Sequence, residues 1–255
     1  MTEPVPDIAP QLVPGADYLA VNRAYWNDRA PAHAVSPGYD VQRFVDDATF
    51  LSGVVQFDLP RLGDIAGLTG IHLQCHIGTD TISLARLGAR MTGLDLSDSS
   101  ISQARDIAVR SQAEVSFIEG EVYAAPELVG ESTFDLVYTG VGALCWLPDI
   151  RRWAEVVATL LKPGGRLFLR EGHPVLWALD ETRTDDLLVL GFPYFETTNA
   201  LAWEQDNTYV EVDRTFQATR NLSWNHGMGE IVSALLAAGL RLTMLVEHQT
   251  VPWTA

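Results

Sequence analysis

Lysine occurs only once in the 255 residues, at Lys162, and the chain has 17 basic against 33 acidic side chains, a formal net charge of −16. A protein this acidic repels both the phosphate backbone of nucleic acids and anionic membrane surfaces, and no basic stripe offsets the charge. We therefore expect a small-molecule substrate, with neither nucleic acid nor membrane as a partner.

Cysteines and long apolar runs are also scarce. The two cysteines, Cys75 and Cys145, are too few for a disulfide framework or a structural zinc site. No apolar run approaches the roughly 18 residues of a membrane-spanning helix. The first residues, MTEPVPDIAP, show neither a basic region nor an apolar run, so a signal peptide is not expected. These absences favour a cytoplasmic protein with reduced thiols. They leave the oligomeric state open, a homodimer included.

The segment 70–97, GIHLQCHIGTDTISLARLGARMTGLDLS, predicts a strand, a tight turn, a helix and a second strand. Gly78 lies at the turn, where the lack of a side chain lets the backbone approach a ligand and helix amides point at it. Asp95 ends the second strand, 17 residues after Gly78. A carboxylate in that position can accept hydrogen bonds from both hydroxyls of a ribose. The segment therefore predicts a βαβ unit that holds an adenosine-like ligand.

Two patterns of NAD(P)-dependent oxidoreductases are missing. The segment 70–97 has no G-x-G-x-x-G loop for a pyrophosphate, and the chain has no Tyr-x-x-x-Lys pair, because its single lysine is Lys162. A nicotinamide cofactor is therefore disfavoured.

Three further segments follow in a fixed order. EVSFIE predicts a strand that ends at Gly120-Glu121-Val122, and FDLVY predicts another that leads into Thr139-Gly140-Val141-Gly142. LLKPGGRLFL predicts a helix stop and then a fifth strand over 166–170. In order and spacing, residues 62–171, and more loosely 223–247, resemble the class I S-adenosylmethionine (SAM) dependent methyltransferases, close to the type 11/12 small-molecule methyltransferases.

The resemblance implies an α/β fold with a Rossmann-like, doubly wound, mostly parallel sheet, N-terminal lid helices and an antiparallel flap insertion. It implies SAM as cofactor, with S-adenosylhomocysteine as product. His72 takes the position of the family's motif I acid, Gln74 and His76 replace its first two glycines, and Gly78 keeps the third. Asp95 would bind the ribose, and Glu121 the adenine amino group. The implied cofactor-binding residues are Tyr25, Trp26, Gln74, Cys75, His76, Gly78, Asp95, Leu96, Glu121, Val122, Thr139 and Gly140.

The chain divides into an N-terminal arm with lid helices (1–55), a SAM-binding core (56–172), a flap insertion (173–225) and a C-terminal helix and strand (226–255). The first 15 residues are expected to be disordered or loosely docked. The expected elements outside the core are helices over 18–30, 41–51 and 228–239, flap strands over 192–198 and 208–219, and a sixth strand over 241–247. In this superfamily a seventh, antiparallel strand would lie beside the sixth.

Methyl transfer needs an acceptor held in line with the electrophilic methyl group and, for a hydroxyl or a protonated amine, a general base. His173 follows the fifth strand and His226 precedes the last helix, so either is a candidate base, although each can equally bond backbone in its loop. The expected substrate-binding residues are Trp146, Glu171, Tyr194, Phe195 and Trp203.

Oxygen is the favoured acceptor atom, as a hydroxyl or a carboxyl group, with nitrogen next. A SAM-binding enzyme without methyl transfer and a degenerate binding module remain alternatives. We expect no metal, because Thr139-Gly140-Val141-Gly142 occupies the place of the Asp/Asn cluster of catechol-type enzymes, and because the two cysteines are not closely spaced.

Overall fold

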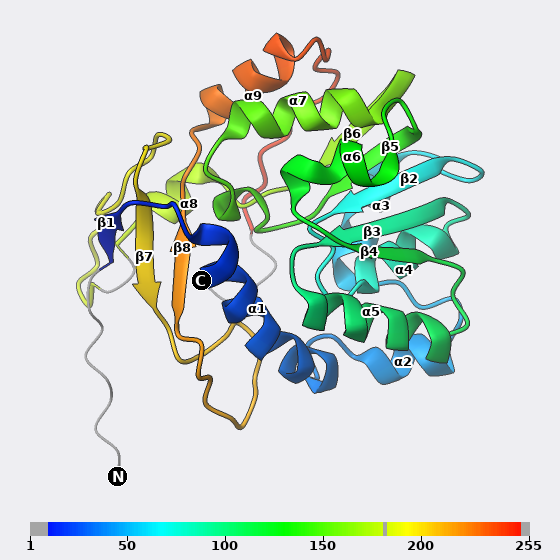
Figure 1. Ribbon diagram of the computed structural model, residues 1–255, viewed down its shortest axis with the longest axis horizontal. Coiled ribbons are helices and arrows are strands. Elements are labelled where there is room, and N and C mark those ends of the chain that lie inside the picture. Colours follow the sequence, from blue (N-terminus) through cyan, green and yellow to red (C-terminus); the bar gives the residue numbers. More distant parts are fainter. Residues whose placement is uncertain (1–9, 181–182, 251–255) are drawn as a thin grey trace.

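The computed structural model describes residues 10–180 and 183–250. Five parallel strands form the main sheet in the order β4-β3-β2-β5-β6 (Figure 1). The strands are β2 (Thr69–Leu73), β3 (Arg90–Asp95), β4 (Ser116–Glu119), β5 (Phe134–Thr139) and β6 (Leu161–Leu169). The chain builds outward from β2 on one side, then crosses to add β5 and β6 on the other. The switch in strand order therefore falls between β2 and its neighbours, where open α/β sheets bind ligands.

Helices cover both faces of this sheet. They are α3 (Gly53–Leu62), α4 (Thr79–Arg86), α5 (Asp98–Arg110), α6 (Ala125–Val129), α7 (Ile150–Leu160) and α9 (Met228–Ala237), with the 3-10 turns η1 (Val122–Ala124) and η2 (Leu144–Trp146). No helix of the described residues combines the length and apolarity needed to cross a membrane.

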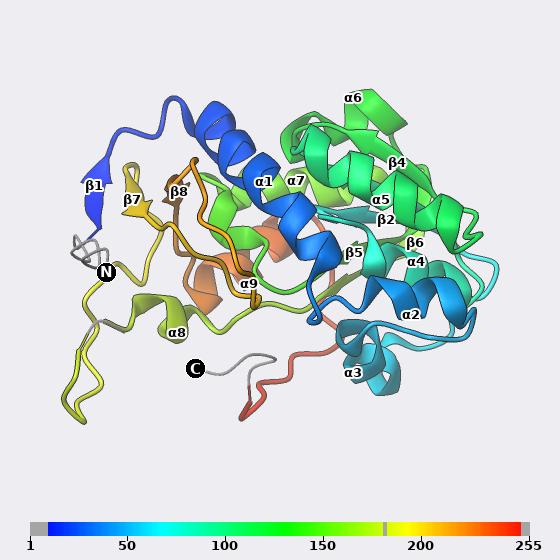
Figure 2. The same ribbon diagram turned by 90° about the horizontal axis from the view of Figure 1, so that it is seen from below.

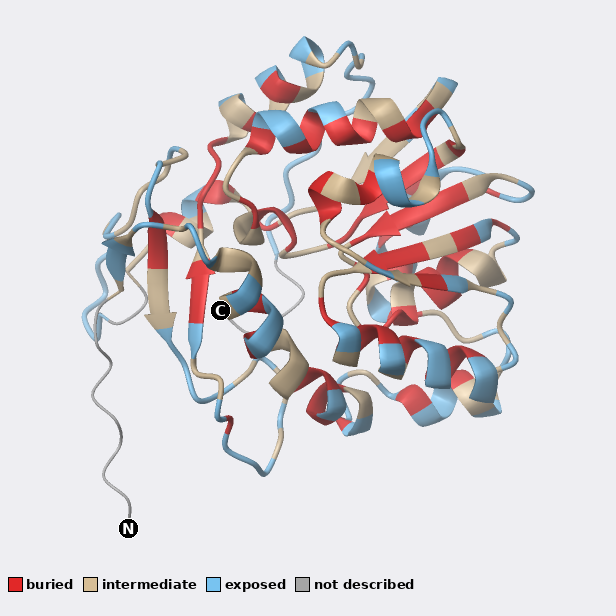
Figure 3. Cartoon of the chain, viewed as in Figure 1, coloured by how far each residue is buried: buried red, intermediate tan, exposed pale blue. Residues whose placement is uncertain are grey.

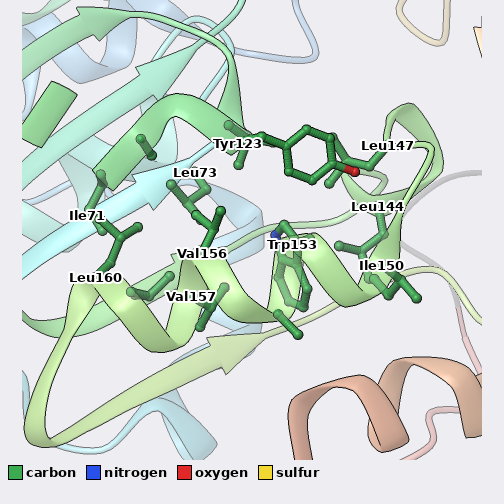
Figure 4. Close-up of a cluster of buried hydrophobic side chains, with 14 of the residues drawn as sticks. Ile71, Leu73, Tyr123, Leu144, Leu147, Ile150, Trp153, Val156, Val157 and Leu160 are labelled. Atoms are coloured by element: carbon green, nitrogen blue, oxygen red, sulfur yellow. The ribbon is translucent and has the colours of Figure 1, made fainter. Parts of the chain in front are cut away.

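The core is densest between α7 and the centre of the sheet. Trp153, Val157 and Leu160 are spaced three or four residues apart, so they share one face of α7, and all three are fully buried. They pack in one cluster with Ile71 and Leu73 of β2 (Figure 4). The inner strands are correspondingly buried along most of their length, as Figure 3 shows. This packing fixes the strand ends that carry the site.

A second, antiparallel sheet in the order β1-β7-β8 lies beside the main one. Its strands are β1 (Gln11–Val13), β7 (Ala200–Glu204) and β8 (Arg220–Ser223), and the remaining helices are α1 (Tyr18–Val35), α2 (Val41–Asp46) and α8 (Pro174–Ala178). Helix α1 packs on both α5 and β8, so it joins the small sheet to the main domain (Figure 2). The α/β, Rossmann-like architecture with an antiparallel insertion is confirmed.

The flap strands lie at other residues than predicted. The segments 192–198 and 208–219 are not strands. The strands of the insertion are instead β7 and β8, which follow these two segments. The β-branched content of 208–219 does not produce a ladder because α1 takes its backbone groups: Arg29 donates to the Ala218 carbonyl, and Asp28 accepts from the Gln217 and Ala218 amides.

Three further predictions, for the N-terminal arm, helix α2 and the C-terminal strand, also need correction. Residues 11–13 of the arm, which was expected to be loose, form β1 and pair with β7, whereas residues 1–9 are not among the described residues. Helix α2 ends at Asp46, because the Asp47 carboxylate accepts the Thr49 amide and closes a turn. The predicted strand over 241–247 is wrong: this segment has no strand partner, and its apolar side chains are exposed. Among the described residues the main sheet therefore has five strands.

Candidate cofactor and acceptor site

A cavity of about 2220 Å³ lies at the carboxyl ends of the parallel strands, between the main sheet, α1 and the small sheet. Most of the residues predicted for the site line it: Tyr25, Trp26, Gln74, Cys75, His76, Asp95, Leu96, Glu121, Val122, Gly140, Trp146, Glu171, His173 and Trp203. The predicted residues that do not line this cavity are Gly78, Thr139, Tyr194, Phe195 and His226. The fold thus brings the proposed cofactor side and acceptor side to one space.

The loop between β2 and α4 keeps a glycine-like backbone although two expected glycines are replaced. Gln74 and His76 have φ angles of 57° and 49°, in the left-handed region that favours glycine. At Gly78 a Cβ atom would lie 2.6 Å from the Phe117 ring, so a glycine is required there. The Gln74 amide donates to the Ala143 carbonyl, while its buried Oε1 finds no donor among the described residues.

Asp95 lies at the end of β3, level with that loop. Its Oδ2 accepts the His76 amide at 2.8 Å, and its Oδ1 accepts the Ser97 amide at 2.9 Å. Burial raises the pKa of Asp95 to about 6, which the two amide hydrogen bonds partly oppose. Each oxygen keeps a lone pair free toward the cavity. The carboxylate can therefore accept two neighbouring hydroxyl groups.

Glu121 lies just after β4, the next strand of the sheet. Its Oε1 accepts the Tyr18 hydroxyl at 3.1 Å, so the first residue of α1 reaches the carboxylate. Burial and the neighbouring Glu121 raise the pKa of the Tyr18 hydroxyl, which therefore remains a donor. Val122 is buried beside it.

Each residue of the Tyr25-Trp26-Asn27 segment of α1 has a separate contact. The Tyr25 hydroxyl donates to the Gln205 side chain of the flap. The Trp26 ring lies 5.1 Å from the rings of both His76 and Trp146, measured between centroids. Asn27 caps α5 instead, through Ser97 and Asp98. Trp26 therefore covers the cofactor loop, whereas Tyr25 ties α1 to the flap.

A chain of hydrogen bonds runs from His76 to the flap. His76 Nδ1 lies 3.0 Å from Ser100 Oγ, and its Nε2 lies 2.7 Å from Nδ1 of His33. His33 Nε2 in turn lies 2.6 Å from Thr208 Oγ1. Burial lowers the pKa of both imidazoles, so both are neutral. Both ring nitrogens of His76 are therefore engaged by protein atoms, and its backbone amide orients Asp95.

Glu171 is half-buried at the cavity, and its hydrogen bonds go to backbone amides. Its carboxylate accepts the amides of Gly142, Ala143, Leu144 and Gly172. Burial raises the pKa of Glu171, against the effect of these four donors. The side chain therefore orders the loop after β5 that carries Trp146, and its contact with a substrate stays a prediction.

The two candidate bases have different surroundings. Both ring nitrogens of His226 face protein atoms: Nε2 lies 2.9 Å from the Leu147 carbonyl and Nδ1 lies 2.9 Å from Oε2 of Glu196. His226 is 2% exposed and lies outside the cavity. His173 lines the cavity, and its Nε2 lies 2.9 Å from Oε1 of Glu247. Only His173 is placed where an acceptor could reach it.

Tyr194 and Phe195 pack together near the start of α9, away from the cavity. The Tyr194 hydroxyl accepts the Met228 amide, and the two rings lie 5.0 Å apart, edge to face. Phe195 is 65% exposed. Trp203 does line the cavity, with its indole N–H donated to Ser223.

Tyr18, His33 and Asp80 are site residues that the sequence analysis did not single out. Tyr18 precedes Tyr25 by seven residues and His33 follows Trp26 by seven, so two full helical turns place each pair on one face of α1. That spacing is a signal that could have found them. Asp80, in the first turn of α4, gave no comparable signal.

The segment 71–167 matches the family model of a methyltransferase domain. A stretch of 108 residues, 42% of this chain, is 36% identical to the ubiquinone biosynthesis O-methyltransferase of Xanthomonas oryzae pv. oryzae (strain PXO99A) and covers 44% of that protein. A stretch of 123 residues, 46% of the chain, is 31% identical to the demethylmenaquinone methyltransferase of Lactococcus lactis subsp. lactis (strain IL1403) and covers 48% of it. The chain thus spans less than half the length of these curated relatives.

The fold has counterparts among solved structures. One, described as an S-adenosylmethionine-dependent methyltransferase from Listeria monocytogenes, superposes with a TM-score of 0.58 at 19% identity, over 78% of this chain and 86% of that one. The family model thus identifies the predicted methyltransferase domain in the segment 71–167, and the solved structure confirms the predicted fold.

Proposed function

We propose that this protein is a SAM-dependent methyltransferase that moves a methyl group to a small-molecule acceptor. The observation that carries the proposal is the pair of carboxylates at the ends of β3 and β4, Asp95 and Glu121, which line one cavity under the cover of α1. Adjacent strands of a sheet are about 4.8 Å apart, which suits the neighbouring ribose and adenine of one nucleoside.

The described residues fit this cofactor. Asp95 has free lone pairs for the ribose hydroxyls, and Glu121 can accept the adenine amino group once Tyr18 shares or yields its oxygen. The unpartnered Oε1 of Gln74 is an acceptor that a ligand donor would satisfy. When bound, SAM supplies an electrophilic methyl group. Trp26 and Trp146 would then exclude water from the transfer.

Oxygen is the acceptor atom that we favour, with nitrogen as the alternative. Aromatic and amide side chains from the flap and the loop after β5 line the acceptor side of the cavity, among them Trp146, Trp203 and Asn221. One of the relatives is named for O-methylation in ubiquinone biosynthesis and another for methylation of demethylmenaquinone. A hydroxyl or carboxyl group on a compact, largely apolar molecule suits such walls. His173, oriented by Glu247, is the base that we propose for a hydroxyl acceptor.

Calorimetric titration with S-adenosylhomocysteine tests the cofactor, with NADH as the comparison ligand. We expect micromolar binding of the first and none of the second. Glu121→Gln should weaken binding about tenfold, because the acceptor of the adenine amino group loses its charge. Glu119→Gln is the matched control on the same strand end: it removes a half-exposed carboxylate, 3.9 Å from Arg23, and should leave affinity unchanged. Binding of neither ligand would instead favour a degenerate binding module.

A further inference from the structure

A second group of polar atoms faces the cavity at the end of β5. Gly140 follows this strand, and a Cβ atom placed there would lie 3.7 Å from Oδ2 of Asp80 and 3.6 Å from Nε2 of His72. All three residues line the cavity. A carboxylate and an imidazole nitrogen therefore converge on the space that Gly140 leaves free.

His72 presents one unbonded nitrogen to this space. The residue is 3% exposed, and its Nδ1 lies 2.9 Å from the Thr81 hydroxyl. No hydrogen bond joins its Nε2 to another described residue. Burial lowers the pKa of His72 to about 3, so the ring is neutral and Nε2 can accept a proton donor when Nδ1 carries the hydrogen. Because His72 lines the cavity, this nitrogen is open to a donor from a ligand.

Asp80 has no cation of its own. Burial raises the pKa of Asp80 to about 6, while Ser52 and the charge of Arg170 oppose the rise. The Arg170 guanidinium is engaged elsewhere: its Nε lies 2.8 Å from Oδ1 of Asp58, and its Nη2 donates to the Val54 carbonyl. None of the ion pairs among the described residues includes Asp80. Asp80 is half-buried in the cavity wall, so its carboxylate is open to a cation that a ligand supplies.

The position relative to Asp95 limits what that ligand can be. Asp95 ends β3 and Gly140 follows β5, and β2 lies between them, so about 10 Å, two strand spacings, separate the two places. A ligand whose ribose binds Asp95 would reach Gly140 with an arm attached at its 5′ carbon. The methionine part of SAM is such an arm, and it ends in an ammonium group.

We propose that Asp80, together with Nε2 of His72, is the receptor for the α-ammonium group of the cofactor, an inference that rests on the proposed function. His72 stands where the family resemblance places an acid, and Asp80, from the first turn of α4, brings a carboxylate to the same space. The negative charge for the ammonium thus comes from the helix and not from the strand.

Two ligands that differ in this arm provide the test. S-Adenosylhomocysteine carries the ammonium, and 5′-methylthioadenosine ends at the thioether. Calorimetry on the full chain should show that Asp80→Asn weakens binding of the first by about 10- to 100-fold, the loss expected for a charged hydrogen bond, and changes binding of the second less than about twofold. Asp95→Asn, the contrast variant, should weaken both ligands because both carry the ribose.

Each result bears on the inference separately from the proposed function. Unchanged S-adenosylhomocysteine affinity in Asp80→Asn, or an equal loss for both ligands, would overturn the ammonium receptor while leaving the cofactor assignment in place. Failure of the unaltered protein to bind either ligand would overturn the proposed function itself. If Asp80→Asn does not fold, the ratio of the two affinities in the unaltered protein should fall between pH 7.5 and 5 as Asp80 protonates. His72 stays neutral over that range. Protonation of Asp95 changes the affinity for both ligands by the same factor, so it does not change their ratio. A constant ratio would contradict the proposal.

Discussion

At the scale of single residues, His173 and His226 show how one residue type serves two purposes. His226 is buried, and its ring joins the loop after β5 to Glu196 of the flap, so its contacts are structural. His173 is partly exposed at the cavity, and its Nδ1 accepts the Val175 amide at the start of α8. The sequence alone places both beside a strand or helix end and cannot separate them, because burial depends on what the flap covers.

Alanine substitutions should separate these two histidines by stability. His226→Ala leaves the Leu144 and Leu147 carbonyls and the Glu196 carboxylate with fewer partners, and we expect a loss of about 2 kcal/mol in the free energy of unfolding. His173→Ala, the comparison variant, removes only the cap of the short helix α8 and should cost about 1 kcal/mol or less. Urea unfolding followed by fluorescence measures both. Equal losses would show that His226 has no special structural role.

At the scale of elements, helix α1 connects the flap to the cofactor loop. The Arg29 guanidinium is fully buried and donates to the carbonyls of Gln205, Asn207 and Ala218. It also lies 3.3 Å from the centre of the Tyr25 ring. The stretch of α1 from Tyr25 to His33, about two and a half turns, thus holds the segment 205–219 without any β-ladder. The acceptor side of the cavity takes its shape from this helix.

Removal of the Arg29 charge should free the flap and spare the core. Arg29→Met leaves buried carbonyl oxygens of the flap without a donor, so we expect amide hydrogen exchange in 205–219 to accelerate about 10- to 100-fold. Exchange in β2 and β5 should not change. Arg23→Met on the same helix is the control, because Arg23 is exposed and makes only a 3.9 Å ion pair. Unchanged exchange in the Arg29 variant would mean that other contacts hold the flap.

The five core strands were predictable because their signals are local. Buried parallel strands show short apolar runs, and glycines and acids mark their ends, so Asp95 and Glu121 could be placed at the cavity from the sequence. The flap strands could not be predicted in this way, because hydrogen bonds from α1 occupy backbone groups of 205–219 that a β-ladder would need. The alternation over 241–247 is a genuine strand pattern, but a pattern does not supply a pairing partner. Asp80 escaped notice because its role depends on Gly140, sixty residues further along the chain.

In the whole molecule, the buried histidines and the buried carboxyl groups change the free energy of unfolding in opposite directions as the pH changes. Burial lowers the pKa of His33 to about 4 and of His72 to about 3, and lowers that of His76 as well. Burial raises the pKa of Asp80 and of Asp95 to about 6. The histidines stabilise the fold above their unfolded pKa of about 6.5, and that stability is lost as the pH falls. The two carboxylates act in the opposite direction, since they favour the fold once protonated below about pH 6.

Two variants separate these opposing contributions between pH 7 and pH 5. Over this interval His33 and His72 each lose about 2 kcal/mol and His76 adds to the loss, whereas Asp80 and Asp95 together gain about 3 kcal/mol and the raised pKa values of Asp58 and Glu171 add to the gain. Denaturant unfolding at the two pH values gives the change in the free energy of unfolding for each protein. Compared with the change in the unaltered protein, His33→Asn should make it more favourable to the fold at pH 5 by about 2 kcal/mol, and Asp95→Asn less favourable by about 1 kcal/mol. The same change in all three proteins would contradict both the neutral burial of His33 and the raised pKa of Asp95.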